Sequence, residues 1–374
     1  MTALALVRYF LVLGTTGFGG PIALVGYMQR DLVEKRGWFT ADEFSRGLAL
    51  AQISPGPLAA QLAAYLGWLR GGVRGAALCG VAFVAPSLAM VLVIATLYVR
   101  FDKHEWLARA FGAVGAAVIG ILARSAVKLA RLTLKRDRLL WTIAALNTVG
   151  VLVLRRESLV VLVAGGLMAV TVRLNFTTKN AASMLPVSLL PFSTPLTQLL
   201  AASPLAQLFE YFAVAGVVVF GSGLAIVPYL FHGVVEQHHW LTERQFLDAI
   251  AVSMITPGPV VIMVAFIGFL VAGVPGAIIS AVAVFLPAWL VVVTVAPHFE
   301  RIRRNARARV FVDGVTAGAT GAIAGAALLL SMRVLTSVEA AVIAMAVVVL
   351  TSARVRCPEP LAIVTAAMAG IAFG

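Results

Sequence analysis

A proline-glycine-proline triplet occurs twice in this chain, at residues 55–57 and 257–259, each time within apolar sequence. Each proline ring removes a backbone amide donor and pushes the preceding residue out of the helical region, so each triplet separates two helices. The N-terminus of a helix carries unpaired amide donors and a partial positive charge, which bind anions without a buried lysine or arginine. The triplets therefore predict a site for a small anion, and a tetrahedral oxyanion fits that description.

A glycine-rich break precedes each triplet and supplies a second helix N-terminus. In the first break Pro21 suits the first helical position, and near the triplets Ser54 and Thr256 offer hydroxyls that can cap the next helix. A single break of this kind is usually a kink or a close-packing site, but its duplication favours a substrate site. The predicted binding residues are Phe18, Gly19, Gly20, Pro21, Gln52, Ser54, Pro55, Gly56, Pro57, Gln61, Phe220, Gly221, Ser222, Gly223, Thr256, Pro257, Gly258 and Pro259.

Four ionisable residues at matching positions are candidates for coupling or gating. Arg46 and Asp248 each lie a little over two turns before a triplet. One interpretation places them at the membrane surface; in the other, Arg46 attracts the anion and Asp248 carries a coupling proton or sets an exit barrier. Glu34 and Glu236 are matched carboxylates, for which we expect a structural or gating role.

The two triplets belong to a longer internal repeat. Residues 9–57 and 211–259 are identical at 19 of 49 aligned positions, including Trp38/Trp240 and the Thr residues two positions later. A slip of one residue continues the match through Pro86/Pro287. This pattern predicts two homologous domains, 1–172 and 206–374, joined by a proline-containing linker at 173–205, of which residues 184–200 alternatively form a short interfacial segment.

The charges of matched loops indicate that the two domains are inverted in the membrane. Residues 28–47 carry four basic residues and their counterpart 230–249 only Arg244, whereas the basic segment 301–309 exceeds its counterpart in the first half. By the positive-inside rule the halves then have opposite orientations, which five crossings each would produce. Arg155 and Arg156 fall outside in this scheme and count against it. The predicted spans are 4–27, 75–98, 110–127, 139–154, 157–172, 206–231, 275–296, 311–331, 335–352 and 359–374, with re-entrant helical hairpins at 42–70 and 244–272.

Composition places the chain in a lipid bilayer. Of its 374 residues 61% are hydrophobic and 12% charged, with a mean hydropathy of +0.99, whereas soluble domains are roughly 45–50% apolar and about 25% charged. We predict an all-α, polytopic integral membrane protein whose net charge of +13 reflects orientation and not nucleic-acid binding. Cys79 and Cys357 lack metal-type or redox-type neighbours, and the sequence predicts no metal site and no cofactor.

These motifs resemble the chromate ion transporter family in its long, two-domain form. The resemblance rests on Gly17–Pro21, on Gly37-Trp38 with Phe44, on the triplets with their flanking residues, and on residues 220–223, which match the first glycine-rich break. It covers nearly the whole chain. It implies a transporter of the bacterial inner membrane that exports chromate, driven by the proton motive force, and confers chromate resistance. The second half is shorter than the long form of the family leads one to expect, and the departure concerns its last span.

Several alternatives stay open at this level. The protein can instead import or exchange sulfate, which has the same shape and charge as chromate, or it can be a passive anion channel. An enzyme such as a chromate reductase is disfavoured because no redox ligands occur. The coupling proton is an expectation from the family, and a homodimer is a further open alternative.

Overall fold

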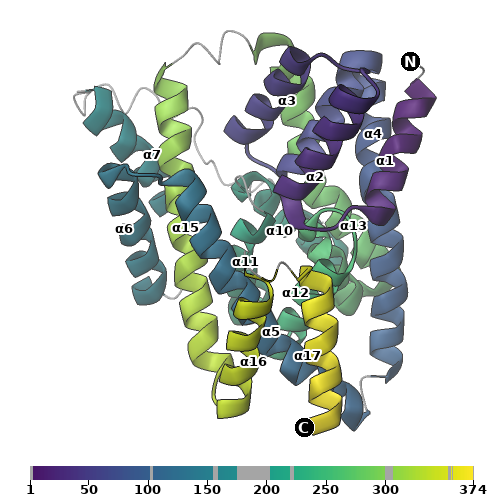
Figure 1. The fold of residues 1–374 in the computed structure, drawn as a ribbon, viewed down its shortest axis with the longest axis vertical. Coiled ribbons are helices and arrows are strands. Elements are labelled where there is room, and N and C mark those ends of the chain that lie inside the picture. The colour runs from purple at the N-terminus through teal and green to yellow at the C-terminus, as the bar shows by residue number, and fades with distance from the viewer. Residues whose placement is uncertain are drawn as a thin grey trace.

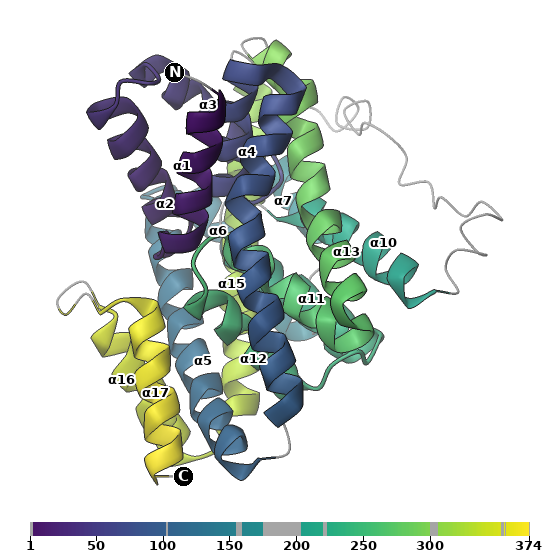
Figure 2. The ribbon, with the colours of Figure 1, turned by 90° about the vertical axis from the view of Figure 1, so that its right-hand side faces the viewer.

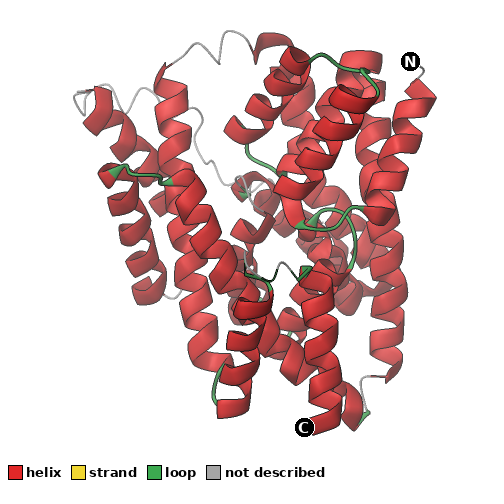
Figure 3. Cartoon of the chain, in the orientation of Figure 1, coloured by secondary structure: helices red, strands yellow, loops and turns green. Residues whose placement is uncertain are grey.

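The chain is helical throughout the part that the structure describes. The computed structural model describes residues 3–101, 104–154, 159–174, 203–219, 223–299, 306–352, 355 and 357–373. Figure 3 shows helices joined by short loops, with no strand among these residues. Four helical segments are long and apolar enough to cross a membrane, namely 58–101, 109–133, 260–298 and 310–334. The prediction of an all-α class with several apolar helices is therefore confirmed.

The two halves contain corresponding elements in the same order (Figure 1). The first half comprises α1 (Ala3–Thr16), α2 (Gly20–Met28), the π-helix η1 (Gln29–Lys35), α3 (Ala41–Ile53), α4 (Leu58–Phe101), α5 (Glu105–Thr133), α6 (Arg138–Leu154) and α7 (Leu159–Leu174). The second comprises α10 (Pro204–Val218), η3 (Gly223–Ile226), α11 (Val227–Leu230), the π-helix η4 (Phe231–Gln237), α12 (Glu243–Ile255), η5 (Val260–Ile262), α13 (Met263–Val295), η6 (Ala296–His298), α15 (Ala306–Val334), α16 (Val338–Leu350) and α17 (Glu359–Phe373). Helices α3 and α12, and likewise η1 and η4, have equal lengths and begin 202 residues apart.

Some predicted spans differ from the helices. The span predicted at 4–27 is interrupted, because Gly19, which precedes α2, and Gly20, its first residue, adopt positive φ angles of 103° and 74°. The second arm of each predicted hairpin continues into the next helix, with kinks at Gly71-Gly72 in α4 and Ala272-Gly273 in α13. Helices α6, α7, α16 and α17 have 17, 16, 13 and 15 residues, fewer than the roughly 20 that a perpendicular crossing needs. Residues 175–202 and the pair Arg155-Arg156 lie outside the described residues.

The repeated threonines begin the helices that lead to the triplets. Thr40 accepts a hydrogen bond from the Glu43 amide (3.1 Å), and the Glu43 carboxylate accepts one from the Thr40 amide (2.8 Å). Thr242 and Gln245 form the same reciprocal pair at the start of α12. Such capping boxes satisfy two amides at a helix start. The repeated Trp-x-Thr therefore has a local structural cause.

Close backbone contacts hold the long helices together. Helix α1 packs on α4, α10 packs on α13, and α4 packs on α13. A Cβ atom on Gly14 would lie 2.4 Å from the Phe83 carbonyl oxygen, and one on Gly216 would lie 2.4 Å from that of Val284. Glycine is required at both positions because no side chain fits between the backbones. In Figure 2, α1–α3 lie toward one end of the molecule and α12, α16 and α17 toward the other.

Candidate functional site

The two triplets meet the two glycine-rich breaks of the opposite halves. The amide of Gly56 donates to the carbonyl of Val219 (2.6 Å), and the amide of Gly258 donates to the carbonyl of Gly17 (2.8 Å). Each donor and each acceptor is 202 residues from its counterpart, so the same contact is made twice with the halves exchanged. Four broken helix ends therefore come together within the protein, where non-helical backbone can be accommodated at membrane depth.

Glycine is the residue that this crossing requires. Gly56 has a φ of 132° and Gly258 a φ of 103°, which residues with a Cβ rarely adopt. A Cβ on Gly56 would lie 2.7 Å from the Cβ of Ala288, and one on Gly258 would lie 2.0 Å from the hydroxyl of Ser87. The triplet glycines thus combine a left-handed backbone with contact against α13 or α4 of the other half.

The carbonyls beside the glycines are hydrogen-bonded by buried side chains. Ser87 donates to the Pro257 carbonyl (2.6 Å), and Gln61 donates through Nε2 to the Pro55 carbonyl (2.6 Å). Both side chains are buried. The carbonyls of Pro55 and Pro257 lie outside the flanking helices, because proline interrupts them. The two side-chain hydrogen bonds therefore supply donors that helical amides would otherwise provide. The triplets are therefore held on both their amide and carbonyl sides.

A cavity of about 870 Å³ opens beside this crossing. Its wall includes Leu58 and Val260, the first residues after the two triplets, and Gln52 of α3. The first residues of a helix precede its first internal hydrogen bond and present their amides outward; in α4 that bond runs from the Gln61 amide to the Pro57 carbonyl. The cavity is thus lined by two helix starts from opposite halves, and its size lies within the range of about 300–1,000 Å³ typical of small-molecule sites.

Two lysines make one wall of the cavity basic. Lys128 near the end of α5 and Lys135 in the following turn line it. Neither forms a close ion pair within the described part of the chain, and the Glu359 carboxylate of the same lining interacts electrostatically with Lys128. Of the two carboxylates in the lining, Asp313 pairs with Arg173 at 3.5 Å, and Glu359 lies in the first turn of α17. Hydroxyl groups complete the polar lining, from Ser125, Thr133 and Thr316. Ammonium, hydroxyl and helix-start amide groups are suitable donors for an oxyanion.

The structure separates the predicted binding residues into three groups. Lining the cavity are Gly19, Gly20, Pro21 and Gln52. Forming or flanking the buried crossing, away from the cavity wall, are Ser54, Pro55, Gly56, Pro57, Gln61, Thr256, Pro257, Gly258 and Pro259. Phe18 is 38% exposed beside the first break and Gly223 is buried in η3. Phe220, Gly221 and Ser222 lie outside the described residues.

Two details of the triplets differ from expectation. The amide of each triplet glycine is bonded to a carbonyl and is not turned toward the cavity. Thr256 ends α12 and donates back to the Val252 carbonyl (3.0 Å), so it does not cap the helix that follows. Ser54 likewise is the C-cap that follows the last residue of α3. Both residues are in extended conformation and precede the proline-glycine-proline turn, which separates them from the start of the next helix. They therefore belong to the end of one helix and do not cap the next.

The four predicted coupling or gating residues lie in different surroundings. Arg46 pairs with Asp42 one turn earlier at 2.5 Å and does not line the cavity. Asp248 is fully buried and accepts a hydrogen bond from the Tyr98 hydroxyl (2.8 Å). Glu34 is exposed, whereas Glu236 bonds to His232 and Arg333.

Lys128, Lys135 and Arg333 were not predicted from the sequence. Both lysines belong to the basic segment 124–138, whose charge by itself indicates only the orientation of the chain in the membrane. That segment was the available clue, since it follows a long apolar helix directly. No motif marks Arg333, whose partners come from residues about 90 positions away.

Comparison with known proteins gives a consistent result. A model of the chromate transporter family matches the chain twice, at residues 4–170 and 206–371. The chromate transport protein of Cupriavidus metallidurans is 47% identical over 371 residues, covering 98% of this chain and 92% of the relative. The probable chromate transport protein of Synechococcus elongatus is 46% identical over 376 residues, covering 98% of this chain and 95% of the relative. The chromate transport protein of Pseudomonas aeruginosa is 32% identical over 332 residues, covering 84% of this chain and 77% of the relative. No solved structure matches the chain significantly.

Proposed function

Since the chain belongs to the chromate transporter family, we propose that it is a secondary transporter that exports chromate across the bacterial inner membrane and thereby confers chromate resistance. The observation that carries the proposal is the cavity beside the crossed triplets, with two lysines in one wall. Chromate is a small tetrahedral dianion. Two helix starts and the ammonium groups of Lys128 and Lys135 offer positive charge and donors to such an anion on one wall of the cavity. Of the two carboxylates in the lining, Asp313 pairs with Arg173 and Glu359 interacts with Lys128.

The direction of transport is inferred from charge. The positive-inside rule assigns the basic segment 124–138 to the cytoplasm, and the cavity takes Lys128 and Lys135 from that segment. The cavity is then open to the cytoplasm and ready to receive an anion for export. The positions of α3 and α12 toward opposite ends in Figure 2 support an inverted arrangement of the halves.

The anion-attracting role moves from Arg46 to the two cavity lysines in this proposal. Arg46 is paired with Asp42 and lies outside the lining. The buried carboxylate of Asp248, with Tyr98 as its hydrogen-bond donor, stays the candidate for the coupling proton. The proton motive force is the proposed driving force.

Accumulation of chromate by whole cells tests the proposal. Cells that express the protein should accumulate less radiolabelled chromate than cells that carry an empty vector, and they should tolerate more chromate in the medium. Equal accumulation would remove the export function. Higher accumulation would favour an importer or a channel.

Competition with sulfate decides the selectivity. Amide and ammonium donors distinguish poorly between two tetrahedral dianions, so we expect excess sulfate to slow chromate transport in reconstituted vesicles. If sulfate is itself accumulated and chromate merely competes, the protein is a sulfate transporter that accepts chromate.

A further inference from the structure

The two halves differ in how their triplet-bearing helices are packed. Helix α3 packs against α4, as its counterpart α12 packs against α13, but α12 packs in addition against α5 and α17. Ala49, Gln52 and Ile53 of α3 form one side of the cavity, and Leu132 and Thr133 of α5 also line it. The cavity therefore separates α3 from the C-terminal end of α5. The corresponding place in the second half, between α12 and the C-terminal end of α15, is bridged by charged side chains.

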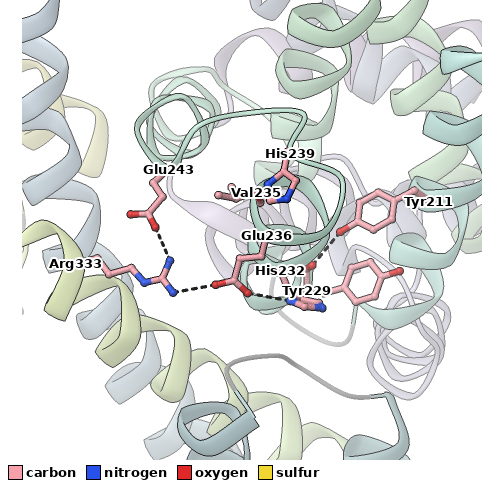
Figure 4. A network of polar contacts seen from close by, with 8 residues as sticks. All are labelled: Tyr211, Tyr229, His232, Val235, Glu236, His239, Glu243 and Arg333. Carbon is pink, nitrogen blue, oxygen red and sulfur yellow. Dashed lines mark hydrogen bonds and ion pairs between the residues drawn. The ribbon is translucent and has the colours of Figure 1, made fainter.

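Arg333 of α15 forms that bridge, as Figure 4 shows. Its guanidinium donates to Glu236 of η4 (2.9 Å) and to Glu243 of α12. Glu236 also contacts His232 Nδ1 (2.9 Å), and the guanidinium lies over the Phe231 ring at 5.2 Å. Arginine suits this role because its planar fork can engage two carboxylates at once. The bridge ties α15 to both elements that lead to the second triplet.

The first half lacks these charges. Helix α5 begins 201 residues before α15, which places Leu132 opposite Arg333. At an offset of 202, Ala41 corresponds to Glu243 and Arg30 to His232. Only Glu34 matches, opposite Glu236; it is exposed and forms no ion pair among the described residues. Within the described residues, the ion-paired bridge therefore occurs in the second half and has no counterpart in the first.

We infer that Arg333, Glu236 and Glu243 are a latch that holds the side opposite the cavity closed and that must open once in each transport cycle. The role of the latch in a transport cycle rests on the proposed function. The ion pairs themselves do not depend on which substrate is transported. Closing one side while the other is open is what alternating access requires of two inverted halves. The latch biases the protein toward the state in which the cavity is open.

Thiol labelling of Leu247 tests the latch. Leu247 is 5% exposed and lies where α12, α5 and α15 meet, since a Cβ on Gly115 would lie 3.5 Å from Leu247 and 3.8 Å from Val334. In a protein whose two cysteines are replaced by alanine, the Leu247→Cys reporter should react slowly with a maleimide. Adding Arg333→Gln should raise the rate by about tenfold, and Glu236→Gln should raise it in the same direction. Arg333→Lys should give an intermediate rate, because its charge is kept while the fork is lost.

Glu34→Gln is the matched control, because Glu34 is the counterpart of Glu236 without the ion pair. It should leave the labelling rate unchanged. A companion protein that keeps only the buried Cys79 reports on general loosening, and its labelling should stay slow in all variants. The inference is overturned if Leu247→Cys reacts no faster with Arg333→Gln than with Glu34→Gln. It is also overturned if Arg333→Gln raises the reaction rate of Cys79 as much as that of Leu247→Cys. No chromate is present, so a failure of the proposed substrate would leave this result unaffected.

Discussion

At the scale of single residues, the crossing depends on backbone that only glycine adopts easily. Gly56 and Gly258 combine positive φ angles with tight contacts to Ala288 and Ser87. Their amides reach across to the carbonyls of the opposite half. The triplets thus act first as structural joints, and they position the helix starts that line the cavity.

Alanine at either glycine should destabilise the protein. Gly56→Ala and Gly258→Ala combine left-handed strain with overpacking, which together cost about 2–5 kcal/mol. Thermal unfolding of the purified protein in detergent should show a lower Tm for both. Gly80→Ala is the control, because a Cβ on Gly80 meets no atom within 4 Å and the position is helical. Equal Tm values for the three variants would refute the steric account.

A second residue-scale prediction concerns Ser87. Its counterpart Ala288 has no hydroxyl, so the bond to the Pro257 carbonyl exists in one half only. Ser87→Ala should lower the free energy of unfolding by about 1 kcal/mol and leave chromate transport intact. Loss of transport without loss of stability would assign Ser87 to the substrate or proton path instead.

At the scale of elements, the residue that follows η1 and the residue that follows η4 each pack against a tyrosine and a tryptophan ring, but one is arginine and the other histidine. We call each such pair of rings an aromatic cage. Arg36 lies over the rings of Tyr9 and Trp38, at 5.5 and 4.7 Å. His238 occupies the equivalent place, stacked on Trp240 at 4.4 Å and edge-on to Tyr211. Arginine stays charged at all working pH values, whereas histidine does not. The second cage alone is therefore sensitive to pH.

Acid should weaken the second cage. Partial burial lowers the pKa of His238, so the unfolded chain binds a proton more readily than the folded protein. The contribution of neutral His238 to the free energy of unfolding is complete above the unfolded pKa of about 6.5. It is lost as the pH falls through that value toward the lower pKa of the folded protein. Between about pH 7.5 and about pH 5.5, the Tm of the unchanged protein should fall more than that of His238→Phe. Identical pH profiles would contradict this prediction.

Local features of these elements were predictable from the sequence, and their assembly was not. The repeated Trp-x-Thr, the triplets and Pro21 mark helix starts and ends because their effects act within a few residues. The bonds from Gly56 to Val219 and from Gly258 to Gly17 join residues more than 160 positions apart, which no local pattern encodes. Lys128 was missed for a related reason: its helix carries no motif, and only packing brings it into the same cavity lining as Gln52.

At the scale of the whole molecule, similar halves adopt different packing. The side between α3 and α5 is open as a cavity, and the side between α12 and α15 is closed by Arg333. If the halves exchange these arrangements during transport, the cavity would open to the opposite face. The crossed triplets lie between the two sides and can serve as the fixed point of that exchange.

If the cavity beside the triplets receives chromate, the KM for chromate should depend on the lysines that line it. Initial rates of radiolabelled chromate uptake into inside-out membrane vesicles would be measured over a range of chromate concentrations for the unchanged protein, Lys128→Gln and Arg46→Gln. Because Lys128 lines the cavity and Arg46 does not, we expect Lys128→Gln to raise the KM for chromate by about tenfold and Arg46→Gln to leave it unchanged. An unchanged KM in Lys128→Gln together with a raised KM in Arg46→Gln would show that the anion binds elsewhere than in this cavity.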